Sequence, residues 1–307
     1  MLDTFDQQKM DRLQPDDISD SLERGSIVYF PHTPVAPPSD EDLEFLREEL
    51  PGLLKLKNIS YHPEAGKVRG LDDSDAEISR RVTRILKQVS KDITAFLFSA
   101  APRLTDNWTI GTSSFRPMQE RGRNLDAHAS NELVHIDAGA YGATHGDRIL
   151  RFFINVNPVE DRVWVSKGNF SELLQSHGEQ ADLAYRHAGQ AYLSKGPLDH
   201  LWSGVVSGLA RAGMPSVKVL DSSPFDREMR RFHNYMKDTP SFQQDMSNHH
   251  EFRFPPFSAW MVFTDTVSHA CTSGQFAFIH TSIVRLENCR LPEIAPINLL
   301  RQAAAAH

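Results

Sequence analysis

A histidine and an aspartate lie two positions apart in residues 132–158, which read ELVHIDAGAYGATHGDRILRFFINVNP. Side chains at positions i and i+2 of an extended chain project to the same side, so His135 and Asp137 are able to bind one metal ion. The pair alone is weak evidence, because the same two residues also occur in polar loops that bind nothing. A metal site needs a third ligand elsewhere in the chain.

His269 is the candidate for this third ligand. It follows an apolar run at 260–263 and precedes a Ser-Gly turn, which predicts a position at the end of a strand. Two histidines and one carboxylate on one face of an octahedron leave three positions open. This is the pattern of non-haem Fe(II) oxygenases, which bind a 2-oxo acid and O2 at the open positions. The residues therefore predict a ferrous site formed by His135, Asp137 and His269.

Three other interpretations stay open at this point. Histidine and aspartate also bind zinc, so a zinc hydrolase is an alternative, although the chain lacks a His-Glu-x-x-His motif. A second alternative is an oxygenase that hydroxylates another small molecule, such as an amino acid. The third is a metal-free β-barrel binding or scaffolding module, in which His135 and Asp137 are ordinary loop residues.

A 2-oxo acid also needs a basic residue to anchor its distal carboxylate, and arginine is preferred because it pairs through two hydrogen bonds. His280 and Arg285 lie downstream of the last predicted metal ligand, and Arg148 and Arg151 lie on the strand expected after His-x-Asp. Positions 148 and 151 have opposite parity, so only one of them points into the barrel. We favour Arg151, with Asn155 on the same face. An ordinary surface position is the alternative for each arginine.

Helices are expected to support these ligands from the N-terminal side. Ser39 and Asp42 predict the start of a helix of about ten residues. Ser74 and Glu77 form a second capping box, and the apolar residues that follow have helical spacing over more than five turns. We expect this long amphipathic helix to cover a sheet. Its apolar positions are Ile78, Val82, Ile85, Leu86, Val89, Ile93, Phe96 and Leu97.

Short segments rich in β-branched and aromatic residues begin near residue 107 and predict strands. They are NWTIGTSSFRPM, RILRFFINVNP, DRVWVSK, HEFRFPPFSAWMVFTDTVSH and QFAFIHTSIVRL. A helical insert at about 169–245 divides them. The predicted fold is α+β, a double-stranded β-helix (a jelly-roll, cupin-like core) with N-terminal buttressing helices. The predicted regions are a helical support (1–106), a catalytic jelly-roll domain (107–290) and a C-terminal tail (291–307) that ends in a frayed alanine run.

Composition excludes several classes of protein. The net charge of −7 and the isoelectric point of about 6.0 argue against a nucleic-acid-binding protein, which needs a basic face. The sequence contains no apolar run long enough to span a membrane and no secretory signal at its start. Cys271 and Cys289 are too few for a disulfide framework or a thiolate zinc site, so a reducing cytoplasm is expected.

Several longer motifs resemble the Kdo hydroxylase family over roughly residues 55–285. They are SSFRPMQERGR, VHID, GDRILRFFINVNPVEDRVW, FDREMRRFHNYMKDTPSFQ and FPPFSAWMVFTDTVSHACTSGQFAF, in the family's order. The resemblance implies an Fe(II)- and 2-oxoglutarate-dependent dioxygenase that uses O2. It also implies hydroxylation of carbon 3 of 3-deoxy-D-manno-oct-2-ulosonic acid (Kdo), giving Ko in the inner core of lipopolysaccharide. His135, Asp137 and His269 match the family's metal ligands, whereas His280 stands where a glutamine is expected.

An anionic octulosonate requires cationic partners, and the matching blocks supply candidates. Arg116, Arg123, Arg148 and Arg162 are expected to meet the sugar carboxylate, and Trp164 to stack on a sugar face. Arginine and tryptophan at these positions are also compatible with ordinary packing at sheet edges.

The resemblance further implies a cytoplasmic enzyme at the inner face of the inner membrane, acting on a Kdo-containing lipid A precursor. Apolar residues of the insert are then expected to be exposed for peripheral membrane contact, with core packing as the alternative. These residues are Leu201, Trp202, Val205 and Val206.

Overall fold

Two facing β-sheets form the centre of the molecule. The computed structural model describes all residues except 55–57, 72–74, 141, 185–192, 194–195, 197–198, 200, 207–220 and 307. In sheet order, the large sheet contains β1 (Leu2–Thr4), β2 (Ile27–Phe30), β9 (Ala259–Phe263), β6 (Arg148–Asn155), β11 (Ala277–Val284), β5 (Thr109–Arg116), β3 (Ile59–His62) and β4 (Lys67–Arg69). The small sheet contains β10 (Ala270–Ser273), β7 (Arg162–Ser166) and β8 (His250–Phe254).

Nearly all of the strand pairing is antiparallel. In the described sheets, only β1 and β2 pair in parallel, at the edge of the large sheet. The chain is therefore a mixed α/β protein with a large antiparallel sheet. The strands predicted from β-branched and aromatic segments are confirmed as β5 to β9 and β11, whereas β10 falls between two predicted segments, where a turn was expected.

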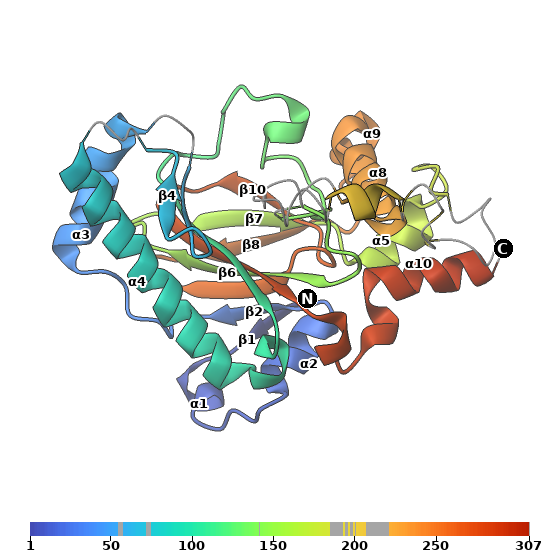
Figure 1. Ribbon diagram of the computed structural model, residues 1–307, viewed down its shortest axis with the longest axis horizontal. Helices are drawn as coiled ribbons and strands as arrows, with labels where there is room; N and C mark the ends of the chain where they lie inside the picture. The colour runs from blue at the N-terminus through green and yellow to red at the C-terminus, as the bar shows by residue number, and fades with distance from the viewer. Residues whose placement is uncertain are drawn as a thin grey trace.

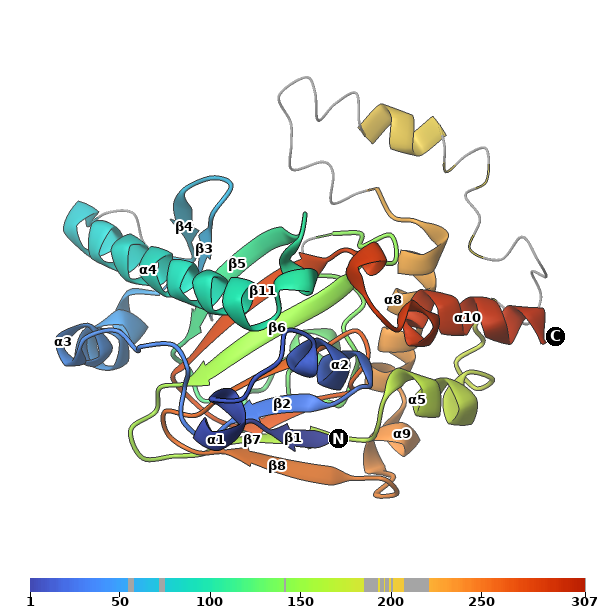
Figure 2. The same ribbon diagram turned by 90° about the horizontal axis from the view of Figure 1, so that it is seen from below.

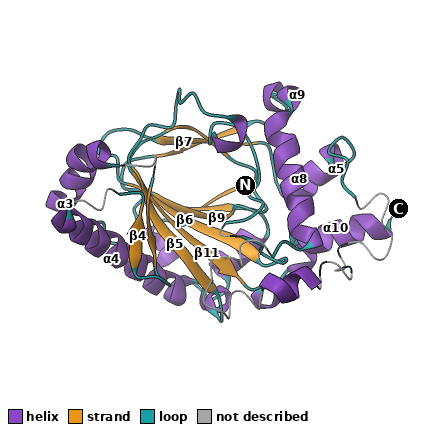
Figure 3. Ribbon diagram, turned by 45° about the horizontal axis from the view of Figure 1, so that its top comes forward, coloured by secondary structure: helices purple, strands orange, loops and turns teal. Residues whose placement is uncertain are grey.

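Aromatic side chains fill the space between the two sheets. Phe153 of β6 lies edge-on to Trp164 of β7 with ring centroids 4.8 Å apart, and Trp260 of β9 stacks on Phe254 of β8 at 3.9 Å. These residues belong to one buried cluster. Burying such large rings stabilises the two layers against each other. Figure 3 shows the two layers of strands, with helices at both ends.

The long helix α4 (Ala76–Ala100) covers the other face of the large sheet, as predicted. Its buried stripe includes Val82, Leu86 and Leu97, which share a core cluster with Phe152 of β6. The observed N-cap is Asp75, whose side chain accepts the N–H groups of residues 77 and 78. The predicted cap residue 74 lies outside the described residues. Figures 1 and 2 show α4 and the small sheet on opposite sides of the large sheet.

The remaining helices form two groups. Those of the N-terminal part are α1 (Gln7–Met10), α2 (Asp17–Glu23) and α3 (Asp40–Glu44), which is followed by helical turns at Phe45–Glu49 and Leu50–Leu53. Ser39 caps α3, as predicted. The second group contains α5 (Phe170–His177), α8 (Pro224–Asp238), α9 (Pro240–Gln244) and α10 (Pro296–Ala305). Figure 1 shows these four helices gathered at the end of the sheets away from α3.

Two regional predictions need correction. The region 1–106 is not a purely helical support, because it contributes β1, β2, β3 and β4 to both edges of the large sheet. These strands contain only three or four residues each, too few for a clear alternating pattern. The C-terminal tail does not fray within residues 296–305, where α10 buries Ile297 and Leu300 beside α5 and α8. Alanine is the strongest helix former, so a packed alanine-rich end is helical.

The insert at about 169–245 is helical where it is described, through α5, residues 201–206, α8 and α9. Much of 185–220 lies outside the described residues. Leu201, Trp202 and Val205 are exposed, as predicted, but Val206 is buried with 2% exposure, so its predicted exposure is wrong. In the described part of the chain, no helix is both long and apolar enough to cross a membrane.

Candidate metal centre

The three predicted metal ligands come together at one end of the small sheet. Ligand atoms of His135, Asp137 and His269 all lie within 4.8 Å of one another, and all three residues are buried. His135 and His269 form an antiparallel bridge with reciprocal backbone hydrogen bonds of 3.1 and 2.8 Å. The backbone N–H of Asp137 donates to the carbonyl of Thr264 at 2.8 Å. Backbone pairing therefore brings together two segments that lie about 130 positions apart in the sequence.

Hydrogen bonds to the backbone fix the orientation of both imidazoles. The Nδ1–H of His135 donates to the carbonyl of Leu133 at 2.7 Å, and that of His269 donates to the carbonyl of Val267 at 3.0 Å. Each ring then carries its lone pair on Nε2, the atom left for a metal. Burial lowers the pKa of both histidines, which keeps them neutral and able to bind a cation.

Asp137 is held as a carboxylate. Burial on its own raises the pKa of Asp137, but the positive charge of Arg151 and the neighbouring histidines outweigh burial and lower the pKa below its usual value. The Nη2 atom of Arg151 lies 2.9 Å from Oδ2 of Asp137. Nevertheless, no described residue gives this buried oxygen a hydrogen bond of acceptable geometry. The carboxylate therefore has a lone pair left for a cation.

A cavity of about 250 Å³ opens beside the three ligands. It is also lined by Arg116, Arg151, Arg162 and Trp164, four residues that the sequence suggested for co-substrate or substrate binding. The ring of Trp164 stacks on that of His269, with centroids 5.2 Å apart and planes 20° apart. The structure therefore places three guanidinium groups and one aromatic ring next to the three predicted metal ligands.

A buried carboxylate that the sequence analysis did not predict organises these arginines. Glu120 accepts a hydrogen bond from Nη2 of Arg162 at 3.1 Å and one from Asn131 at 3.1 Å. Nitrogens of Arg116 and Arg123 lie 4.0 and 3.6 Å from its oxygens. Burial alone would raise the pKa of Glu120, but Arg162 and Arg116 lower it. One carboxylate thus faces three arginines, which leaves an excess of positive charge.

This positive charge persists at neutral pH. Burial lowers the pKa of Arg116 to about 10, so its guanidinium stays protonated. The side chain of Arg162 is only 3% exposed, and its Nε and Nη1 have no hydrogen-bond partner among the described residues. A buried cation with unused donors is costly unless an anion reaches it. The cavity is therefore suited to carboxylate ligands.

Arg148 lies on the opposite face of β6 from the cavity. Its Nε donates to Oδ2 of Asp265 at 2.7 Å, and its guanidinium stacks on the ring of Phe263 at 4.2 Å. It does not line the cavity. We therefore replace its predicted substrate role with a structural one. Arg123 pairs with Glu120 and is also absent from the cavity wall.

Three residues suggested for co-substrate binding also lie away from the cavity. Asn155 is fully buried and shapes a turn by donating to the carbonyls of Glu160 and Phe254. His280 faces away from the cavity, because its neighbour Ile279 takes the inward position on β11. Arg285 is largely exposed and forms an ion pair with Asp147 at 2.8 Å. These contacts support structural roles for all three.

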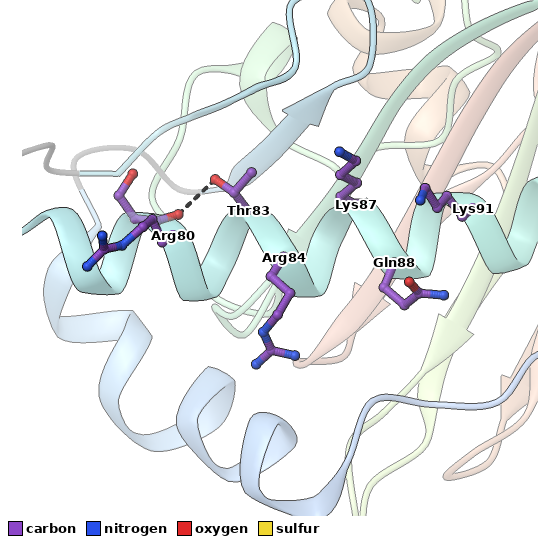
Figure 4. A pocket seen from close by; sticks show the side chains of 7 residues that line it. Arg80, Thr83, Arg84, Lys87, Gln88 and Lys91 are labelled. Carbon is purple, nitrogen blue, oxygen red and sulfur yellow. Dashed lines mark hydrogen bonds between the residues drawn. The ribbon is translucent and has the colours of Figure 1, made fainter.

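A second surface cavity, of about 470 Å³, lies along the exposed side of α4. Figure 4 shows Arg80, Arg84, Lys87 and Lys91 extending from this helix. The large sheet separates α4 from the metal ligands. This basic surface is therefore not part of the candidate metal centre.

Comparison with known proteins gives an independent result. A family model described as 3-deoxy-D-manno-oct-2-ulosonic acid (Kdo) hydroxylase matches residues 6–307. A search of curated proteins found no match. The apo structure of the Kdo hydroxylase KdoO, a non-haem Fe(II) α-ketoglutarate-dependent dioxygenase, superposes with a TM-score of 0.78 at 27% identity. The alignment covers 98% of this chain and 95% of the KdoO chain.

Ligand complexes of KdoO are similar over the same extent of both chains. The complex with α-ketoglutarate (2-oxoglutarate) and Fe(III) gives a TM-score of 0.78 at 28% identity, and the cobalt(II) complex gives 0.79 at 28%. The family match spans nearly the whole sequence, and the structural similarity includes both sheets and the helices around them. The chain belongs to the Kdo hydroxylase family.

Proposed function

We propose that the chain is an Fe(II)- and 2-oxoglutarate-dependent dioxygenase that hydroxylates Kdo, at carbon 3, to give Ko. One observation carries the proposal: two neutral histidines and one ionised aspartate converge beside a buried, arginine-rich cavity. The metal and co-substrate bound by the KdoO structures, together with family membership, support the same activity.

The donor atoms fit a ferrous ion. His135 and His269 each present Nε2, and Asp137 presents an oxygen without a hydrogen-bond partner in the described chain. Two imidazoles and one carboxylate match the facial triad that leaves positions open for a 2-oxo acid and O2. A zinc hydrolase has less support, since Asp137 is the only carboxylate residue among those that line the cavity in the described structure. Such an enzyme needs a further group to activate water.

The protein's own residues hold and orient the reactants. When bound, iron and 2-oxoglutarate supply the oxidising chemistry that replaces a C–H bond with C–OH. We assign Arg162 to the distal carboxylate of 2-oxoglutarate, because its Nε and Nη1 are buried without partners among the described atoms. Arg151, which the sequence favoured as this anchor, has only its Nε buried without a partner among the described atoms, and its Nη2 lies 2.9 Å from Asp137. Arg116 then receives the carboxylate of the sugar, and Trp164 restricts access of water to His269.

We further assign the two facing sheets to the jelly-roll (double-stranded β-helix) class. The large sheet contains the adjacent antiparallel strands β9, β6, β11 and β5, and the small sheet contains β10, β7 and β8. The bridge between His135 and His269 extends the small sheet by the ligand-bearing segment. This arrangement supports a metal site at one open end of the two layers.

Exposed apolar residues support action on a lipid-linked substrate. Leu201, Trp202 and Val205 are 67%, 50% and 46% exposed within a short helix. We propose that this helix contacts the inner membrane from the cytoplasm, where the substrate is a Kdo-containing lipid A precursor. Flotation with anionic liposomes tests this: the wild type is expected to float, and L201S/W202S/V205S to remain below. Equal flotation would contradict the proposal.

The activity itself is tested with purified protein, Fe(II), 2-oxoglutarate and O2. Kdo-lipid A is expected to drive succinate formation and to gain the mass of one oxygen, and His135→Ala is expected to abolish both. A panel of small substrates, including free Kdo and amino acids, serves as the comparison. Succinate formation driven by an amino acid but not by either Kdo substrate would overturn the substrate assignment.

A further inference from the structure

The segment that carries His135 and Asp137 is held on two sides by different means. On one side, His135 pairs with His269 through backbone hydrogen bonds. On the other side, side chains from α8 and α9 bond the backbone of the same segment. These helices follow the ligand segment by about 100 positions and belong to the insert. Their contacts place insert residues directly behind two of the metal ligands.

Gln243, at the end of α9, binds both polar groups of one backbone residue. Its Oε1 accepts the N–H of Val134 at 3.0 Å, and its Nε2 donates to the carbonyl of Val134 at 2.9 Å. An adjacent antiparallel strand makes the same reciprocal pair of bonds. The side chain of Gln243 thus supplies, next to His135, the pairing that a neighbouring strand would give.

His233 of α8 contacts the residue between the two ligands. Its Nδ1–H donates to the carbonyl of Ile136 at 2.6 Å, and its ring lies edge-on to that of His135 with centroids 5.0 Å apart. One turn further along α8, Lys237 donates to the carbonyl of Ser130 at 2.8 Å. The side chains of α8 therefore fix the backbone on both sides of residue 134.

The two helices are themselves anchored, which makes them a rigid support. Phe232, Met236 and Phe242 lie in one buried cluster with Val134 and Ile136. At the start of α8, Ser223 and Asp226 form a capping box. The carboxylate of Asp226 also accepts the N–H of residue 144, beyond the ligand segment, at 2.6 Å. Movement of α8 or α9 would therefore displace the metal ligands.

We infer that Gln243 and His233 are positioning residues for the metal centre. They take the place of a neighbouring strand and hold His135 and Asp137 where both reach one ion. This inference rests on the proposed function, since it assumes that the triad binds a metal. It predicts that removing either side chain weakens metal binding, although neither Gln243 nor His233 is a proposed metal ligand.

Cobalt(II) binding to the purified apoprotein tests the inference without measuring activity. Gln243→Ala and His233→Ala are expected to weaken Co(II) binding by roughly 10- to 100-fold, the range for residues that orient metal ligands. His233→Asn keeps an N–H donor near the position of Nδ1 and is expected to stay within about threefold of the wild type. Arg230→Ala, at an exposed position on the same helix, is the matched control and is expected to bind normally.

Two further measurements separate positioning from general stability. Hydrogen exchange of the Val134 amide is expected to speed up in Gln243→Ala, and the visible spectrum of bound Co(II) to change with the coordination geometry. If Gln243→Ala fails to fold, Gln243→Glu replaces it. This variant keeps the acceptor for Val134 N–H but loses the donor to Val134 O, and it is expected to bind Co(II) more weakly than the wild type.

The outcomes distinguish the inference from the function on which it rests. If the wild type binds no Co(II), the proposed metal function is overturned. If the wild type binds Co(II) and the folded Gln243 and His233 variants bind it within about threefold with the wild-type spectrum, the positioning role is overturned and the metal site stands. If Arg230→Ala loses as much affinity as His233→Ala, the effect belongs to the helix in general and the inference also fails.

Discussion

The two faces of strand β6 each carry an arginine paired with an aspartate, and the pairs differ. On the face toward α4, Arg148 donates to both oxygens of Asp265, at 2.7 and 3.5 Å, and both side chains are almost fully buried. On the face toward the cavity, Arg151 approaches Asp137 at 2.9 Å and is 19% exposed. There Oδ2 of Asp137 lacks a hydrogen bond from the described residues.

The difference separates a structural ion pair from a functional one. In the outer pair, Arg148 and Asp265, two nitrogens of the guanidinium donate to the carboxylate, which leaves it little capacity to bind a cation. In the inner pair the charge of Arg151 keeps Asp137 ionised while a lone pair stays available. The same two residue types therefore stabilise the sheet on one face and, on the other, keep the proposed metal ligand Asp137 ionised.

Among the variants proposed here, breaking the ion pair between Arg148 and Asp265 is expected to have the largest effect. Arg148→Met removes the charge, retains much of the volume and leaves Asp265 buried without its counter-ion. The free energy of unfolding is expected to fall by about 3–5 kcal/mol, measured by urea denaturation. The double variant Arg148→Met/Asp265→Asn is expected to recover part of this loss. A decrease below about 1 kcal/mol for the single variant would contradict the structural role.

Replacing Asp137, in the inner pair with Arg151, is expected to affect metal binding more than stability. Asp137→Ala removes a proposed metal ligand, so Co(II) affinity is expected to fall at least about 100-fold, a free-energy loss of about 2.7 kcal/mol or more. The free energy of unfolding of the apoprotein is expected to fall less than in Arg148→Met, because Arg151, left without its partner, is 19% exposed, whereas Asp265 is almost fully buried. Unchanged Co(II) affinity, measured by titration, would remove Asp137 from the metal site.

His280 lies beside Phe152 on the face of β11 that is turned away from the cavity. Its protonation makes the stability of this face depend on pH. Burial lowers its pKa to about 4, and it hydrogen-bonds to Ser113 at 2.7 Å. Between pH 6.5 and about 4, His280 is protonated in the unfolded chain but neutral in the folded chain. Stability is therefore lost as pH falls from 6.5 to about 4 and then levels off.

The variant His280→Gln is expected to lack this contribution. A tenfold change in proton affinity corresponds to about 1.4 kcal/mol, so near pH 5 the variant is expected to lose about 2 kcal/mol less stability than the wild type. Denaturation at pH 7 and pH 5 measures the difference. Its Co(II) affinity at pH 7 is expected to match the wild type, because His280 does not line the cavity. Parallel pH profiles of stability would contradict this prediction.

Weakening the inner pair at the arginine is expected to have the smallest effect. Arg151→Gln removes the charge that lowers the pKa of Asp137, and burial then raises that pKa. Co(II) affinity relative to the wild type is expected to fall about tenfold at pH 5 and less at pH 7.5, because a protonated carboxyl binds metal poorly. The ratio cancels protonation of the histidines, which both proteins share. A pH-independent ratio would show that Arg151 does not control this carboxylate.

Local patterns in the sequence were sufficient for much of the fold. The apolar spacing predicted α4, and segments rich in β-branched and aromatic residues predicted β5 to β9 and β11. The edge strands β1 to β4 were missed because three or four residues carry little pattern. The packing of α10 was missed because its alanines and apolar residues become meaningful only beside α5 and α8.

The residues of the candidate site were likewise only partly predictable from the sequence. His135 and Asp137 were predicted from donor type and i, i+2 spacing, and His269 from its position between an apolar run and a Ser-Gly turn, all of which are local properties of the sequence. Strand parity predicted that only one of Arg148 and Arg151 points inward, and the structure places Arg151, the favoured residue, on the cavity wall. Glu120 and His233 were not found, because their roles depend on contacts between distant segments that no spacing reveals.

The most direct test is the anomalous diffraction of Co(II) in crystals of the wild-type protein. We predict one strong peak at the end of the small sheet, roughly 2.0–2.2 Å from Nε2 of His135, Nε2 of His269 and one oxygen of Asp137. No peak is expected at Asp265. A peak bound by other residues, or full occupancy at this site in Asp137→Ala, would contradict the assignment of the inner aspartate as a metal ligand.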